Sequence, residues 1–98
     1  MPEKDWIKDL PDGFYIYVNR TTKGANITDF RVVLIYDGLC ITRYDTAHGY
    51  AHRDVLGRKC ALIRKEKYDS VSLNELFKHA IDDLSANYAT YLAFFNAN

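Results

Sequence analysis

Apolar and polar residues alternate at every second position through residues 13–20, which is the pattern of a strand that buries one face. Residues 29–36 and 39–45 are two further runs that read as strands. Asp37 and Gly38 separate the last two runs, and both residue types accept the positive φ angles of a two-residue hairpin turn. Residues 60–68 form a further run rich in β-forming side chains. The pattern predicts four mainly antiparallel strands.

The apolar period changes to three and four residues after Ser72, which indicates a long amphipathic helix. Ser72 and Glu75 fit a capping box at its start. The apolar stripe consists of Leu73, Leu76, Phe77, Ala80, Ile81, Leu84, Tyr88, Tyr91, Leu92 and Phe95. A helix of about 24 residues is longer than a typical strand. We therefore expect its aromatic C-terminal end to overhang the sheet, where it offers a surface for a homodimer.

The remaining segments lack a sustained period. Residues 1–10 predict a short helix or coil, residues 21–28 a loop, and residues 46–59 a loop with two glycines. No repeat or linker divides the chain, so we expect one domain over residues 1–98. The predicted fold class is α+β, with a four-stranded mainly antiparallel sheet covered on one face by the C-terminal helix.

Charge is unevenly distributed, although the whole chain is formally neutral. Residues 20–67 carry ten Lys and Arg against five acids, and such a basic centre attracts anions such as RNA phosphates. The candidate nucleic-acid contacts are Arg58, Lys59, Arg64 and Lys65. No apolar run reaches the length of a membrane helix, and the charged start does not resemble a signal peptide. We expect a cytoplasmic protein that does not bind membranes.

Titratable side chains are concentrated in residues 43–54, RYDTAHGYAHRD, where a predicted strand ends and a loop begins. The candidate catalytic residues are Arg43, Tyr44, Asp45, His48, His52, Arg53 and Asp54. A histidine pair can remove the proton of a ribose 2′-hydroxyl and protonate the departing 5′-oxygen, while arginine stabilises the charged phosphorane. This scheme requires neither a metal nor another cofactor.

Two other interpretations of this segment remain open. His48 and His52 are spaced as ligands on a helix would be, with Asp45 or Asp54 as a third ligand, but Gly49 between them disfavours a helix. In the other interpretation, arginine pairs with aspartate and the histidines bond to loop carbonyls, which gives a rigid and catalytically inert turn.

Residues 41–56 resemble a family of small prokaryotic proteins with the signature R-Y-D-x-A-H-G-x-x-H-x-D. The signature falls on Arg43, Tyr44, Asp45, Ala47, His48, Gly49, His52 and Asp54. More distantly, the segment is similar to TumE-like toxins of toxin-antitoxin pairs, although those proteins carry more histidines after this element. The resemblance implies a toxin-like protein of a defence module, an antitoxin protein as its partner, and RNA as its target.

Together these observations predict a toxin-like, metal-independent ribonuclease that uses His48 and His52 as its proton-transfer pair. The alternative is a non-catalytic module that binds a nucleic acid or a protein through its basic residues. A third reading is a homodimeric structural protein that associates through the end of its helix.

Overall fold

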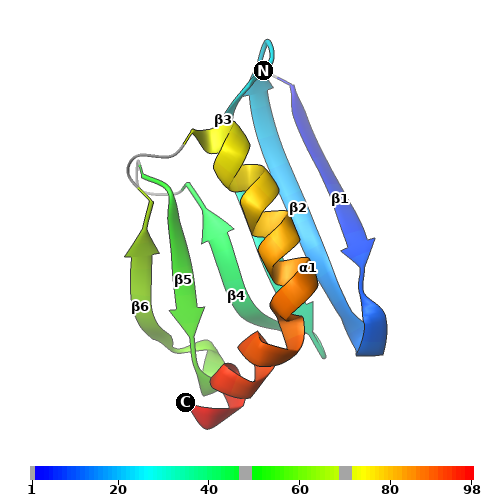
Figure 1. Ribbon diagram of the computed structural model, residues 1–98, viewed down its shortest axis with the longest axis vertical. Coiled ribbons are helices and arrows are strands. Elements are labelled where there is room, and N and C mark those ends of the chain that lie inside the picture. Colours follow the sequence, from blue (N-terminus) through cyan, green and yellow to red (C-terminus); the bar gives the residue numbers. More distant parts are fainter. Residues whose placement is uncertain (1, 47–49, 69–71) are drawn as a thin grey trace.

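A computed structural model describes residues 2–46, 50–68 and 72–98 as one antiparallel sheet with a long helix across it (Figure 1). The strands are β1 (Glu3–Asp9), β2 (Phe14–Lys23), β3 (Asn26–Tyr36), β4 (Leu39–Asp45), β5 (His52–Leu56) and β6 (Leu62–Lys67). They lie in the sheet in their order along the chain. Short 3-10 helices, η1 (Pro11–Gly13) and η3 (Arg58–Cys60), join β1 to β2 and β5 to β6, and α1 (Leu73–Ala97) follows.

The α+β class and the helix are confirmed, but the sheet has six strands and not four. Asp37 and Gly38 form the predicted hairpin turn with φ angles of 53° and 75°. The segment predicted as a loop at residues 21–28 instead extends β2 and β3, and only residues 24 and 25 turn. The Ser72 hydroxyl accepts a hydrogen bond from the backbone N–H of Glu75, as one half of a capping box requires.

The two unpredicted strands are polar on both faces. β1 has no fully buried side chain; its backbone pairs with β2, and its half-buried Trp6 packs against Phe77 of α1. β5 is buried throughout, but its first three residues are His52, Arg53 and Asp54. Neither sequence shows the alternation of apolar and polar residues that indicates a strand.

The core lies between α1 and one face of the sheet. Ile16, Val18, Val32 and Leu34 of the central strands are fully buried, and Leu76, Ala80 and Leu84 cover them from α1 at helical spacing. Burial of each such side chain stabilises the fold by about 1.5–3 kcal/mol before the entropy of ordering the chain is subtracted. Among the described residues, no helix covers the other face of the sheet (Figure 1).

The predicted overhang of the helix is wrong, because β2 and β3 have 10 and 11 residues and match the 25 residues of α1 in length. Phe95 is buried, and the ring of Tyr88 lies 4.7 Å from that of Phe14. The helix ends against Gly57, where an added Cβ would lie 2.8 Å from the backbone oxygen of Asn98. The aromatic end of α1 therefore packs on its own sheet, and the homodimer stays a prediction.

In the described part of the chain, no helix combines the length and the apolar composition that crossing a membrane requires.

Candidate functional site

The alternation of side chains along β4 and β5 divides the predicted site between the two faces of the sheet. Tyr44 donates a hydrogen bond to Asp83 of α1, and the guanidinium of Arg53 lies 5.0 Å from the ring centre of Tyr91, so both face the helix. Their neighbours in sequence must point to the opposite face. Antiparallel pairing places Arg43 beside Asp54, and Asp45 beside His52, on the face that carries no helix.

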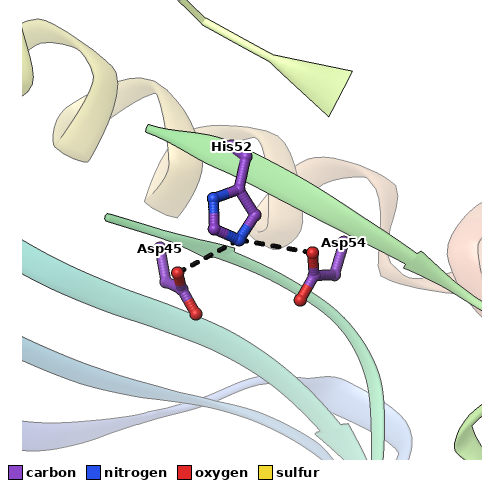
Figure 2. Close-up of side chains that lie close together, drawn as sticks. All are labelled: Asp45, His52 and Asp54. Atoms are coloured by element: carbon purple, nitrogen blue, oxygen red, sulfur yellow. Dashed lines mark ion pairs between the residues drawn. The ribbon is translucent and has the colours of Figure 1, made fainter. Parts of the chain in front are cut away.

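His52 is the centre of this polar group, and its side chain is only 1% exposed. Its Nε2 lies 3.2 Å from Oδ1 of Asp45 and 3.3 Å from Oδ1 of Asp54 (Figure 2). Lys65 of β6 brings its Nζ to 3.4 Å from the same Nε2 and to 2.8 Å from Oδ1 of Asp54. Two carboxylates and an ammonium group thus converge on one ring nitrogen.

The other ring nitrogen of His52 determines what Nε2 can do. Nδ1 lies 3.2 Å from the backbone oxygen of Tyr50, and a carbonyl oxygen only accepts hydrogen bonds, so Nδ1 carries the hydrogen. When the ring is neutral, Nε2 accepts a hydrogen bond from Lys65. When it is charged, Nε2 donates to Asp45 or Asp54. The same arrangement of side chains therefore accommodates both protonation states of the imidazole.

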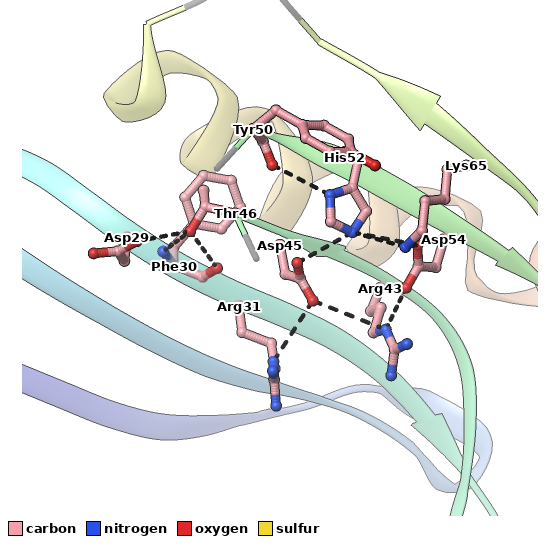
Figure 3. Close-up of polar contacts among 10 residues, drawn as sticks. All are labelled: Asp29, Phe30, Arg31, Arg43, Asp45, Thr46, Tyr50, His52, Asp54 and Lys65. Carbon is pink, nitrogen blue, oxygen red and sulfur yellow. Dashed lines mark hydrogen bonds and ion pairs between the residues drawn. The ribbon is translucent and has the colours of Figure 1, made fainter. Parts of the chain in front are cut away.

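Arginines complete the group, which we call the His52 cluster: Arg31, Arg43, Asp45, His52, Asp54 and Lys65 (Figure 3). Nε of Arg43 lies 2.6 Å from Oδ2 of Asp54, and Nε of Arg31 lies 3.8 Å from Oδ2 of Asp45. The carboxylates and the imidazole are buried, whereas the side chains of Arg31, Arg43 and Lys65 are 55%, 39% and 28% exposed. The cluster thus presents cations to solvent above buried acids.

Asp54 is ionised in this environment. Burial alone would raise the pKa of its carboxyl group, but hydrogen bonds from Lys65 and Arg43 outweigh burial and hold the pKa below its ordinary value. Partial burial would likewise lower the pKa of Arg43, and the bond to Asp54 more than reverses that effect. The cluster therefore contains ionised groups of opposite charge in direct contact.

A polar hollow of about 470 Å³ lies next to the cluster on the same face of the sheet. Its lining comes from β1 to β4 and the residue after β4: Glu3, Tyr17, Asn19, Thr21, Asp29, Phe30, Arg31, Asp45 and Thr46. Asp45 and Arg31 belong to both the hollow and the cluster, so they connect the two. The volume lies within the range of small-molecule sites.

The remaining predicted residues lie outside the His52 cluster. Arg53 bonds to Glu66 and Thr42 on the helix side, and Arg64 bonds to Glu66. The exposed Arg58 and Lys59 belong to η3, at the far end of β5 from His52 (Figure 1). Of the predicted catalytic residues, the structure brings together Arg43, Asp45, His52 and Asp54, and His48 lies outside the described residues.

Sequence reasoning assigned Lys65 to nucleic-acid binding and missed Arg31 and most of the hollow. A signal for the hollow was present in β2, where Tyr17, Asn19 and Thr21 alternate with core residues and form a polar face. Arg31 gave no such signal, because its proximity to Asp45 follows from the pairing of β3 with β4.

Asp45, His52 and Asp54 could also hold a divalent cation, because one oxygen or nitrogen atom from each lies within 4.8 Å of the others. Among the contacts of the described residues, however, the ammonium of Lys65 already lies against Asp54 and near Nε2. A metal ion would have to displace this ammonium group.

Replacing Lys65 with Met is therefore expected to raise the affinity of the cluster for Mn²⁺ by at least about tenfold, or about 1.4 kcal/mol. The reason is that removal of the ammonium leaves the carboxylate of Asp54 available to a cation. Titration calorimetry of the wild type and Lys65→Met measures the change. Lys67→Met, on the same face of β6, is the matched control and should bind Mn²⁺ like the wild type; equal affinities of all three proteins would contradict the expectation.

The family model described as a domain of unknown function (DUF7718) matches residues 1–98. No curated protein and no solved structure matches the chain.

Proposed function

We propose that the chain, which belongs to the DUF7718 family, is a toxin-like ribonuclease that cleaves RNA by proton transfer without a metal. The observation that carries the proposal is the convergence of Asp45, Asp54 and Lys65 on Nε2 of His52. The toxin assignment, with an antitoxin protein as partner, rests on the resemblance of residues 41–56 to TumE-like toxins.

The exposed cations of the cluster account for binding of the scissile phosphate. Arg43 and Lys65 each direct hydrogen-bond donors to Asp54 and keep part of the side chain in solvent. Charged donors of this kind bind phosphate oxygens and stabilise the additional negative charge of a phosphorane. Arg31 extends the same rim toward the hollow.

Proton transfer is assigned to Asp45 and His52 together. The imidazole is almost fully buried, whereas the carboxylate of Asp45 lines the hollow and contacts Nε2. A proton from the ribose 2′-hydroxyl passes by way of Asp45 to Nε2 while the 2′-oxygen forms a bond to phosphorus. The bond between phosphorus and the 5′-oxygen breaks, which gives a 2′,3′-cyclic phosphate and a 5′-hydroxyl end.

A second proton has to reach the departing 5′-oxygen. Lys65 is a suitable donor, since its Nζ lies 3.4 Å from Nε2. After it protonates the 5′-oxygen, Lys65 recovers a proton from the charged imidazole, and both groups return to their starting states. His48, which the sequence predicted as the partner of His52, remains a second candidate for this role.

Cleavage of an end-labelled RNA in the presence of EDTA tests the proposal. The wild type should produce 2′,3′-cyclic phosphate ends, and His52→Gln should cleave at least about 100-fold more slowly, as removal of a general acid or base does. His79→Gln is the matched control, because His79 is exposed on α1 outside the cluster. Thermal unfolding of all three proteins shows whether each is folded. A wild type that does not cut RNA, or a folded His52→Gln protein with wild-type activity, would refute the ribonuclease.

The near-complete burial of His52 favours a second candidate, a non-catalytic module that binds RNA through Arg31, Arg43 and Lys65. In that case RNA would bind without being cut, and His52→Gln would bind as the wild type does. Arg43→Ala and Lys65→Ala would each weaken binding and reduce its dependence on salt.

A further inference from the structure

We propose that the polar hollow beside the His52 cluster is a nucleobase subsite that prefers guanine, and this inference rests on the proposed ribonuclease function. The hollow is open on the face that carries no helix, and it is joined to the cluster through Asp45 and Arg31. A nucleotide in the hollow therefore has its phosphate beside the exposed arginines.

The charge of the hollow decides which part of a nucleotide it takes. Among the described residues that line it, Glu3, Asp29 and Asp45 are acids and Arg31 is a cation. A phosphate would be repelled by such a lining, whereas an uncharged base that carries N–H groups would be attracted. The phosphate is instead drawn to the rim, where Arg31 and Arg43 are 55% and 39% exposed.

The carboxylates of Glu3, Asp29 and Asp45 accept hydrogen bonds and do not donate them when ionised, which favours a base edge with adjacent donors, as in guanine, over the other bases. The Watson–Crick edge of guanine has two adjacent donors, N1–H and the N2 amino group, and these match the two oxygens of one carboxylate. Uracil has a single N–H between two carbonyl groups, so it offers this lining the fewest donors. RNA-binding proteins commonly read unstacked bases by hydrogen bonds to this edge and by stacking on an aromatic ring.

Asp29 and Tyr17 are the side chains best placed for these two tasks. Asp29 of β3 is exposed and lines the hollow. The hydroxyl of Thr46 donates a hydrogen bond to Oδ1 of Asp29 at 3.3 Å. Tyr17 is half-buried and lines the hollow, and its hydroxyl donates a hydrogen bond to Asp5 on β1. Asp29 thus supplies acceptors for the base edge, and Tyr17 supplies a ring for its face.

Binding of 3′-GMP and 3′-UMP to the wild type, followed by NMR of the ¹⁵N-labelled protein, tests the subsite directly. We expect 3′-GMP to shift amide signals of β2 and β3 and to bind at least about tenfold more tightly than 3′-UMP, because a bidentate base contact discriminates by about 1–3 kcal/mol. Asp29→Asn should remove this preference, since an amide offers only one acceptor. Asp9→Asn changes an exposed acid of β1 outside the hollow and should keep the preference.

The outcomes separate the subsite from the ribonuclease. If the wild type cuts RNA equally after every base and binds both nucleotides equally, the subsite is wrong and the ribonuclease stands. If 3′-GMP binds in an Asp29-dependent manner but no RNA is cut, the subsite stands and the ribonuclease is wrong. Shifts confined to residues outside β1 to β4, or an unchanged preference in Asp29→Asn, would also overturn the subsite.

Discussion

Asp54→Asn is expected to lower the free energy of unfolding by about 3 kcal/mol at pH 7, within the range for breaking a buried ion pair. The side chain of Asp54 is 1% exposed and pairs with Arg43 at 2.6 Å and Lys65 at 2.8 Å. An asparagine keeps the shape but removes the charge, and its amide hydrogens face cationic donors. Partial exposure of both cations keeps the loss below the largest values known for such pairs.

The loss of free energy of unfolding in Asp54→Asn should depend on pH, because the pKa of Asp54 differs between the folded and the unfolded protein. The folded-state pKa lies below the ordinary value, so the carboxylate stabilises the folded protein above its unfolded-state pKa of about 4. This contribution is lost as the pH falls through the folded-state pKa. The wild type and Asp54→Asn should therefore differ most at neutral pH and become similar in acid.

Urea unfolding at pH 7 and pH 3 measures both effects. The groups that face Asp54 are Arg43, Lys65 and His52, and all of them remain in the variant. Asp82→Asn, which changes an exposed acid on α1, is the matched control and should stay within about 0.5 kcal/mol of the wild type at both pH values. If the wild type and Asp54→Asn differ as much in free energy of unfolding at pH 3 as at pH 7, the charge of Asp54 is not the cause of the difference.

The sequence predicted those elements whose side chains divide cleanly between a buried and an exposed face. β2 and α1 follow this rule, whereas β3 was predicted from its unbroken apolar run, and the hairpin at Asp37 and Gly38 follows from backbone preference. β1 was missed because it has charged residues on both faces and its core contact is made by Trp6, which leaves no alternation of apolar and polar residues. The length of β2 and β3 was underestimated for the same reason, since their distal ends are polar.

The sequence predicted which segment contains the candidate site, but not which of its side chains lie on the same face of the sheet. The sequence predicts residues 43–45 as a strand end but residues 46–59 as a loop, so it does not assign the side chains of His52, Arg53 and Asp54 to faces of the sheet. Once β5 is a strand, the two-residue period places His52 and Asp54 together and sends Arg53 to the helix side. The contribution of Lys65 and Arg31 depends on strand pairing across the sheet, which the local sequence does not encode.

Asp83→Ala is expected to lower the free energy of unfolding by about 3 kcal/mol, because two tyrosine hydroxyls lose their shared acceptor. Tyr44 of β4 donates to Oδ2 of Asp83 at 2.7 Å, and Tyr91 of α1 donates to the same oxygen. Burial would raise the pKa of Asp83, but the bonds from Tyr91, Tyr44 and Asn87 outweigh it and lower the pKa. Burial followed by the bond to Asp83 raises the pKa of Tyr91 to about 12.

A double-variant experiment shows whether the cost comes from the hydroxyl groups. Tyr44→Phe removes the donor that is 1% exposed, so adding it to Asp83→Ala should recover at least about 1 kcal/mol of the loss. Asp82→Ala, at the neighbouring exposed position of α1, should leave stability within about 0.5 kcal/mol of the wild type. Strictly additive effects of the two substitutions would rule out the proposed coupling.

The contact between Tyr44 and Asp83 also bears on the His52 cluster, because Tyr44 lies between Arg43 and Asp45 on β4. One face of this strand is fixed to α1 by the tyrosine, and the other presents the two cluster residues. A shift of β4 along its partners would move Arg43 and Asp45 away from Asp54 and His52 together. We therefore expect folded Asp83→Ala protein to cleave RNA more slowly than the wild type, and Asp83→Ala combined with Lys65→Met to bind Mn²⁺ more weakly than Lys65→Met alone. A folded Asp83→Ala protein with wild-type cleavage would contradict this expectation.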